Sequence, residues 1–257
     1  MNAPALHIDA RGEGRALVLA HGFGGSARNF RPQQRAFAPE YHVVAFDQRG
    51  HARSGAPQEP SAYTLAQLGG DFGRVLDAIE AERAVVGGLS LGAAAAFEFA
   101  LTTPERVDAL VLAALPGPEG FAQVAADFAD AIDEHGLEAA GERFAWGPRS
   151  GLDAAGAQLV KQGFLEHPPH AMSALLRGAI SELARPRAED PRLAELVTPL
   201  LLIAGDSDTP ALRANDTLAA VVPRAERVVV PDAGHVVNLA APVPFNRALR
   251  EFLKLWS

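Results

Sequence analysis

The chain has 257 residues, of which 48% are hydrophobic and 21% charged, and its formal net charge at pH 7 is −8. This length suits one domain with an insertion, and the composition is that of an ordinary globular protein. The acidic balance and the lack of lysine- or arginine-rich tracts argue against a nucleic-acid or anionic-membrane partner. The sequence contains no cysteine, which excludes disulfides, thiolate metal sites and a cysteine nucleophile.

The hydrophobic runs carry no targeting or membrane signal. The opening residues, Met1–Pro4, lack the basic and apolar segments of a secretory signal peptide. No run approaches the 18 uninterrupted apolar residues that suggest a transmembrane helix. We therefore expect a cytoplasmic protein.

Residues 1–116 alternate between short apolar runs and amphipathic stretches. The runs are almost continuously apolar, which predicts parallel strands buried on both faces by helices. In the longest of the predicted helices, Thr64 and Gln67 are spaced for a capping box. We expect strands at Leu6–Asp9 (an edge strand), Ala16–Ala20, His42–Phe46, Ala84–Val86 and Val107–Ala113, and helices at Pro32–Ala38, Thr64–Arg83 and Leu91–Leu101.

The alternation stops between Pro116 and Pro199, where no strand pattern is found. Residues 117–198 are therefore expected to form a helical lid (cap) inserted into a core made of residues 1–116 and 199–257. Helical patches are expected at Phe121–Glu134, Leu137–Phe144, Ala154–Leu165 and His170–Leu183. Phe144, Trp146 and Phe164 suit an apolar pocket wall or packing inside the lid. His167 and His170 flank two prolines and are expected in a solvated turn, with a place in the pocket lining as the alternative.

The alternation resumes after the insertion. We expect strands at Pro199–Ala204 and Glu226–Val230, and helices at Pro210–Ala220 and Val243–Leu255. The sheet is thus extended beyond Val107–Ala113 by two more parallel strands.

A serine stands between two glycines in Gly88-Leu89-Ser90-Leu91-Gly92. The run before it reads as a buried strand, and the segment after it has strong helix propensity. A serine on a sharp strand-to-helix turn is lifted clear of the backbone, and small flanking residues make that turn possible. The motif therefore predicts a nucleophilic Ser90, with a structural helix cap as the alternative interpretation.

Polar residues follow two later strands, where the carboxyl ends of a parallel sheet gather chemistry. Asp206 and Asp208 follow the strand at Pro199–Ala204, and His235 follows the strand at Glu226–Val230. With Ser90, the chain order is serine, acid, histidine. In such a triad the imidazole takes the serine proton, and the carboxylate holds the imidazole in its productive tautomer.

Five motifs in this order resemble the α/β-hydrolase superfamily over nearly the whole chain. Within it, the chain is similar to small bacterial esterases and to enol-lactonase-like and perhydrolase-like members. The resemblance implies a mostly parallel sheet of about seven strands, with helices on both faces and a helical lid. The motifs are His21–Gly25, Asp47–Gly55, Gly88–Gly92, Gly205–Asp208 and Asp232–His235.

The resemblance also assigns individual residues. The family turn Gly-x-x-Asp places the triad acid at Asp208, with Asp206 as the rival. The oxyanion hole would be formed by the backbone N–H groups of Phe23 and Leu91. Two positions depart from the family pattern, since Ala52 and Ala93 stand where relatives commonly have glycine. Both side chains are small, and we expect both to be tolerated.

These features predict a serine hydrolase that cleaves a carboxylic ester or lactone of a small, partly apolar molecule through an acyl-enzyme. The same triad could serve C–C bond hydrolysis, perhydrolysis, acyl transfer or peptide hydrolysis, and a non-enzymatic ligand receptor is the alternative of another class. We expect no cofactor and no metal, because no histidine pair has zinc spacing. His51 and Arg49 are expected to be structural, with Arg49 joining neighbouring loops. The sequence does not indicate the oligomeric state.

Overall fold

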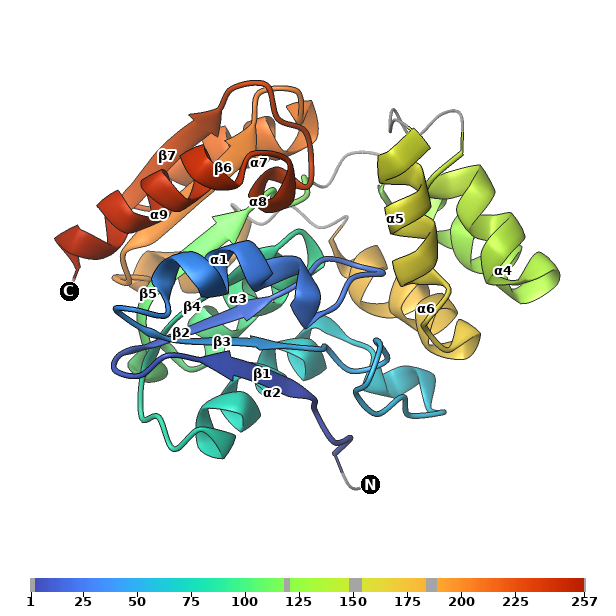
Figure 1. The fold of residues 1–257 in the computed structure, drawn as a ribbon, viewed down its shortest axis with the longest axis horizontal. Helices are drawn as coiled ribbons and strands as arrows, with labels where there is room; N and C mark the ends of the chain where they lie inside the picture. The colour runs from blue at the N-terminus through green and yellow to red at the C-terminus, as the bar shows by residue number, and fades with distance from the viewer. Residues whose placement is uncertain (1–2, 118–120, 148–153, 184–188, 257) are drawn as a thin grey trace.

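A seven-stranded sheet forms the centre of the computed structural model, which describes residues 3–117, 121–147, 154–183 and 189–256 (Figure 1). The strand order is β1-β3-β2-β4-β5-β6-β7, in which β1 is antiparallel to β3 and every other pair is parallel. This is the mostly parallel sheet predicted from the sequence. The strands are β1 (Ile8–Arg11), β2 (Ala16–Ala20), β3 (His42–Phe46), β4 (Ala84–Leu89), β5 (Val107–Ala113), β6 (Leu200–Gly205) and β7 (Ala225–Val230).

The central strands are buried on both faces because helices cover both. Along β2, for example, Leu17 and Leu19 belong to one apolar cluster, while Val18 belongs to the other. Helices α2 and α3 pack into the cluster of Val18, and α1 and α9 into the cluster of Leu17. The helices of the core are α1 (Arg31–Phe37), α2 (Leu65–Ala78), α3 (Leu91–Thr102), α7 (Thr209–Ala219), α8 (Val237–Ala240) and α9 (Pro242–Leu255), with 3-10 turns η1 (Ala27–Phe30), η2 (Pro60–Ala62) and η3 (Pro104–Arg106). A further 3-10 turn, η6 (Pro191–Glu195), lies between β5 and β6.

Helix α2 is shorter than the sequence predicts, and its first turn is capped differently. Its cap residue Thr64 accepts a hydrogen bond from the Gln67 N–H at 3.2 Å, as a capping box requires. The Gln67 side chain, however, accepts from Arg49 Nη1 at 3.0 Å and so engages the neighbouring loop. Only half of the predicted capping box is therefore formed.

The segment between β5 and β6, called the insertion below, is helical where it is described, and no strand occurs in its described part. Its helices are α4 (Phe121–Phe144), α5 (Ala154–Phe164), α6 (Pro169–Leu175) and the π-helical turn η4 (Leu176–Ile180), and they stand beside the sheet in Figure 1. Gly136 interrupts α4 with φ of +78°, at the point where the sequence separates two helical patches.

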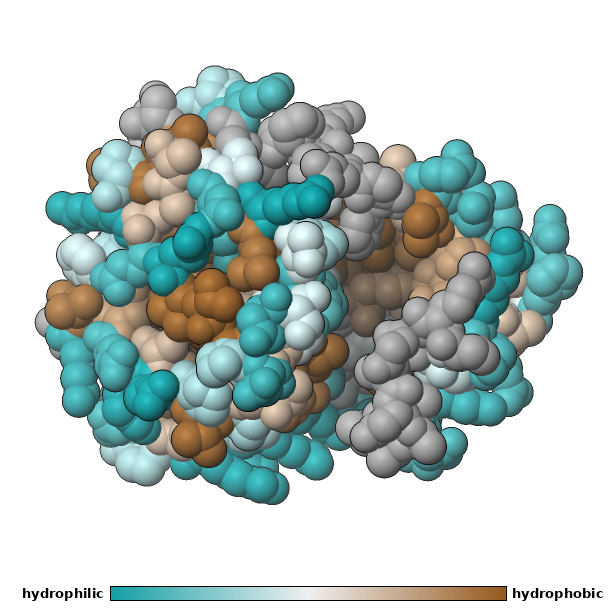
Figure 2. Space-filling view, turned by 90° about the horizontal axis from the view of Figure 1, so that it is seen from above, coloured by the Kyte–Doolittle hydropathy of each residue, from teal (hydrophilic) through white to brown (hydrophobic). Residues whose placement is uncertain are grey.

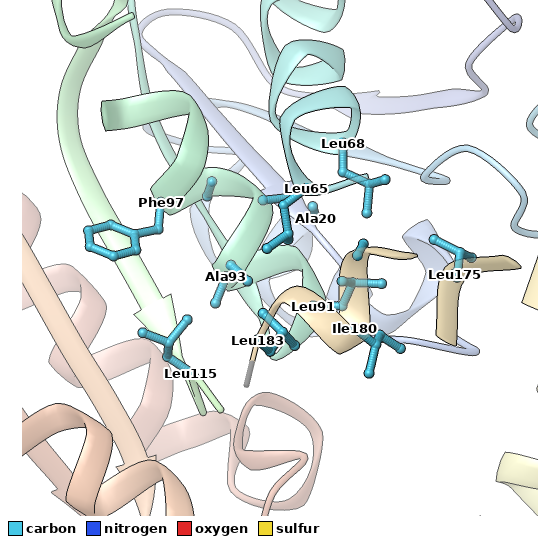
Figure 3. Packing of buried hydrophobic residues seen from close by; sticks show 14 of the residues in the cluster. Ala20, Leu65, Leu68, Leu91, Ala93, Phe97, Leu115, Leu175, Ile180 and Leu183 are labelled. Atoms are coloured by element: carbon cyan, nitrogen blue, oxygen red, sulfur yellow. The ribbon is translucent and has the colours of Figure 1, made fainter. Parts of the chain in front are cut away.

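The insertion packs directly on two core helices. Leu175, Ile180 and Leu183 lie beside Leu65 of α2 and Leu91 of α3 in one continuous apolar cluster (Figure 3). A hydrogen bond also joins the insertion to the core, since the Ala179 N–H donates to the Tyr63 carbonyl at 2.7 Å. The division into a core and a lid over residues 117–198 stays a prediction.

Among the described helices, none combines the length and the hydropathy that crossing a membrane requires.

Candidate active site

Ser90 occupies a strained turn between β4 and α3. Its φ is +54° and its ψ is −113°, a conformation that costs a residue with a side chain about 1–3 kcal/mol. The turn is held by the Ser90 N–H, which donates to the Ala113 carbonyl of β5 at 2.9 Å. A β-carbon at Gly88 or Gly92 would lie 2.4 or 2.1 Å from the Ala20 carbonyl oxygen, so only glycine fits at either position.

Asp208 holds the imidazole of His235. It is 7% exposed and caps α7, accepting the Ala211 N–H at 3.3 Å through Oδ1. Its other oxygen, Oδ2, lies 2.7 Å from Nδ1 of His235. When Nδ1–H donates this bond, the lone pair of Nε2 is left to accept a proton, as a general base requires.

Asp206, the rival acid, has a different set of partners. Its carboxylate accepts the N–H of Asp232 at 3.0 Å and the N–H of Ala233 at 3.3 Å. The hydrogen bond from Asp232 is the largest influence and lowers the pKa of Asp206 below its usual value. Asp206 therefore shapes the loop that carries His235, whereas Asp208 contacts the imidazole itself.

The structure does not join Ser90 to His235. Within the described residues the two side chains share no hydrogen bond, and the imidazole is half-exposed. In unliganded active sites, the distance between such groups is often greater than in the complex that reacts. Asp208 and the imidazole of His235 are thus in contact, and Ser90 lies on a sharp turn. The contact between Ser90 and His235 that the predicted triad requires is not formed.

The loop of residues 21–25 lies against Ser90. A β-carbon at Gly22 would be 3.4 Å from the Ser90 Cβ, which places the following residue, Phe23, beside the nucleophile turn. The Phe23 N–H has no acceptor among the described residues. Leu91 is the first residue of α3, and the N–H groups of the first turn of a helix have no acceptor within that helix. Both amides suit the oxyanion hole that the sequence predicts.

His21, which begins this loop, and His51, in the loop after β3, are both fully buried. His21 Nε2 accepts the Gln48 N–H at 3.0 Å, and its Nδ1–H donates to the Gly22 carbonyl at 2.8 Å. His51 Nε2 accepts the Gly24 N–H at 3.2 Å. Burial lowers the pKa of His21 to about 4 and holds that of His51 well below its usual value. The structural role expected for His51 stays a prediction.

His167 contradicts the prediction of a solvated turn. Its side chain is buried, its Nδ1 accepts the Ala52 N–H at 2.9 Å, and its ring meets that of His51 edge-on at 5.0 Å. Burial is the largest influence and lowers its pKa. His170 is half-buried and contacts Gln58 near the surface. His167 and its partner Ala52 are 115 residues apart in the sequence, so no local pattern predicts their contact.

Aromatic rings connect the insertion to the 21–25 loop. Phe23 meets Phe128 and Phe164 edge-on at 6.0 and 5.7 Å, and Phe128 stacks on Phe144 at 4.9 Å. Trp146 lies edge-on to Phe164 at 5.6 Å. Figure 2 shows a hollow between the core and the helices of the insertion, with hydrophobic surface inside it. The rings pack within the insertion and also reach the candidate site.

Two ion pairs hold the loop after β3, one of them fully buried and the other with a half-exposed arginine. Arg49 binds Asp71 through two bonds of 2.7 Å, so it joins this loop to α2 as predicted. Asp47 accepts the N–H of Ala27 at 2.7 Å and Arg53 Nε at 2.9 Å. Burial raises the pKa of Asp47, but these bonds outweigh it and the pKa is lowered. No group of three potential metal ligands is found in the described part of the chain.

Comparisons with known proteins identify the family of the chain. Residues 15–144 match the family described as alpha/beta hydrolase fold. The chain is 30% identical to "Putative carbamate hydrolase RutD" of Pseudomonas syringae, over 96% of this chain and 97% of that protein. It is 26% identical to 3-oxoadipate enol-lactonase 2 of Acinetobacter baylyi, over 93% and 88%. The crystal structure of the enol-lactonase from Burkholderia xenovorans superposes with a TM-score of 0.85 at 24% identity, covering 98% of each chain. The chain is therefore an enzyme of the alpha/beta hydrolase fold family.

Proposed function

We propose that this enzyme cleaves a carboxylic ester or lactone of a small, partly apolar molecule, with Ser90, His235 and Asp208 as its catalytic triad. The observation that carries the proposal is the 2.7 Å contact between Asp208 and the imidazole of His235. That contact leaves Nε2 as the base for a serine already raised on a strained turn.

The reaction begins with attack of Ser90 Oγ on the carbonyl carbon, as its proton passes to His235 Nε2. The carbonyl oxygen becomes an oxyanion, which the N–H groups of Phe23 and Leu91 stabilise. The C–O bond then breaks, and His235 returns the proton to the leaving alkoxide, leaving an acyl group on Ser90. In a lactone the alcohol stays attached to that acyl group.

Water completes the cycle through the same groups. His235 accepts a proton from the water as its oxygen attacks the acyl carbon, and the serine leaves with that proton restored. Asp208 stabilises the positive charge that the imidazole carries in both halves. No redox step is needed, and water is the only co-reactant in this balance.

The side chains beside the candidate oxyanion hole favour a partly apolar substrate. Phe23 carries one of the two proposed donors, and its ring contacts Phe128 and Phe164 of the insertion. An acyl group bound near these rings would exchange water for apolar contact. The named relatives include an enol-lactonase, which supports a lactone as one form of the substrate.

A labelling and hydrolysis experiment tests the proposal. A fluorophosphonate should label the native chain at Ser90 and leave Ser90→Ala unlabelled. A panel of p-nitrophenyl esters of increasing chain length, assayed beside aliphatic lactones, should show turnover that Ser90→Ala and His235→Ala each reduce by several orders of magnitude. Labelling at another residue, or turnover that survives Ser90→Ala, would refute the assignment.

A further inference from the structure

Two core loops at the carboxyl ends of β2 and β3 are bound to each other. These are the 21–25 loop and the 47–55 loop. The Gly24 N–H of the first donates to His51 Nε2 of the second at 3.2 Å. The peptide that links Phe23 to Gly24 is therefore fixed in part by the position of the His51 ring.

The turn that follows His51 is strained. Ala52 has φ of +43°, in the left-handed region that disfavours residues with a side chain. The Ala52 N–H donates to Nδ1 of His167, 2.9 Å away. The acceptor of the Ala52 N–H therefore comes from the insertion, whereas the next two N–H groups of the turn, those of Arg53 and Ser54, donate to core acceptors.

His167 is suited to this bond because it is fixed on several sides. It is 4% exposed, and its ring packs edge-on against His51 and against Phe164. The preceding residue, Glu166, forms an ion pair with Arg28 of the core. His167 Nε2 is buried, and Nδ1 supplies the hydrogen bond to the Ala52 N–H.

We infer that His167 is a positioning residue for the oxyanion hole. Its bond to Ala52 fixes the turn that carries His51, and His51 in turn fixes Gly24 and the adjacent Phe23 amide. The insertion thus sets the geometry of a donor in the core, in addition to covering it. This inference rests on the proposed function, since Phe23 is a donor only if the site hydrolyses an acyl group.

A purely structural role for His167 makes different predictions. A packing residue would change stability without changing the chemical step, and a substrate contact would change KM more than kcat. A positioning residue changes kcat, because an oxyanion donor acts mainly in the transition state. The strained Ala52 also offers an internal test, since glycine at that position adopts the turn without external support.

The experiment compares His167→Leu with His167→Asn, whose amide oxygen can occupy the position of Nδ1, and with His170→Leu as a matched control from the same segment. With the best p-nitrophenyl ester of the panel, His167→Leu should lower kcat about 10- to 100-fold, with KM changed less than threefold. His167→Asn should recover most of that loss, and His170→Leu should stay within twofold of the native kcat. The Leu substitution should reduce kcat less in an Ala52→Gly background than in the native one.

Hydrogen–deuterium exchange supplies a readout independent of turnover. The Gly24 amide should exchange faster in His167→Leu than in the native chain or in His170→Leu. A native enzyme that is unlabelled and inactive would refute the proposed function, while this exchange would still report on the positioning of the loop. Unchanged kcat and Gly24 exchange in a folded His167→Leu, or an equal loss of kcat in folded His167→Asn, would overturn the inference. If His167→Leu does not fold, the kcat of His167→Asn and the exchange rate of its Gly24 amide decide whether the inference stands.

Discussion

Asp208 and Asp206 stand two residues apart on one turn and contact different parts of the loop that carries His235. Asp208 Oδ2 lies 2.7 Å from the imidazole Nδ1, whereas Asp206 accepts backbone N–H groups at 3.0 and 3.3 Å. One carboxylate therefore contacts the imidazole, and the other contacts the backbone of the loop that carries it.

Substitution by asparagine should separate these two roles. Asp208→Asn is expected to lower kcat by about 10⁴, because an amide in this position favours the wrong imidazole tautomer. Asp206→Asn should lower kcat by less than about tenfold, because it weakens only backbone contacts. Steady-state assays with one ester measure both, and thermal unfolding checks that each variant is folded. A larger loss from Asp206→Asn would reassign the acid.

Two glycine-to-alanine variants should have opposite effects on stability. Gly92→Ala places a β-carbon 2.1 Å from the Ala20 carbonyl oxygen, so the backbone must move. We expect it to lower the free energy of unfolding by more than about 2 kcal/mol. Gly70→Ala, in α2, meets no atom within 4 Å. It should raise the free energy of unfolding by about 0.5–1 kcal/mol, since glycine weakens a helix interior. Urea unfolding measures both, and a neutral Gly92→Ala would contradict the steric argument.

The sequence predicts much of the core, because local patterns and buried strands coincide there. The expected bounds of β2, β3 and β5 match the structure residue for residue. The five-stranded run from β3 to β6 is buried on both faces, so its apolar residues form unbroken runs that are easy to identify. The glycines around Ser90 are equally informative, because backbone atoms occupy the space that a β-carbon would need.

Features set by distant contacts are not predicted. His167 was expected in solvent, because its local sequence of polar residues and prolines resembles a surface turn, yet it binds Ala52 across 115 residues. That alanine is tolerated at position 52 stays a prediction, and the φ of +43° that the residue adopts there is not indicated by its size. Helix α8 was also missed, since Val237–Ala240 is only four residues long.

Removal of the Phe164 ring should destabilise the insertion. It should also change the preference of the enzyme for the acyl chain length of the ester. Phe164 is 2% exposed and contacts the rings of Phe23, Phe128 and Trp146. Phe164→Ala is expected to lower the free energy of unfolding by about 3–5 kcal/mol. If the cluster borders the substrate, as proposed, longer p-nitrophenyl esters should gain in kcat/KM relative to the acetate. Leu165→Ala, at a position 39% exposed, is the matched control and should change stability by less than about 0.5 kcal/mol. An unchanged ester preference in folded Phe164→Ala would place the cluster away from the acyl group.

The buried histidines should make the protein acid-sensitive well above the range in which its carboxylates titrate. Burial lowers the pKa of His21 from 6.5 to about 4, and it lowers the pKa of His51 and of His167 in the same direction. Below pH 6.5 the unfolded chain therefore binds protons that the folded chain does not bind, so stability is complete above pH 6.5 and falls as the pH approaches 4. His21 alone accounts for a loss of about 2 kcal/mol between pH 7.5 and pH 5.

Asp47 provides the internal comparison for this acid effect. Its pKa is lowered from 3.8, so the stability that its ionised form contributes is lost only below that value. Urea unfolding at pH 7.5, 6 and 5 therefore isolates the histidine contribution. A His21→Asn variant, which keeps a hydrogen-bonding side chain but has no titratable ring, should show a smaller decrease across the same range. A free energy of unfolding that stays constant from pH 7.5 to pH 5 would mean that these rings do not remain neutral through burial.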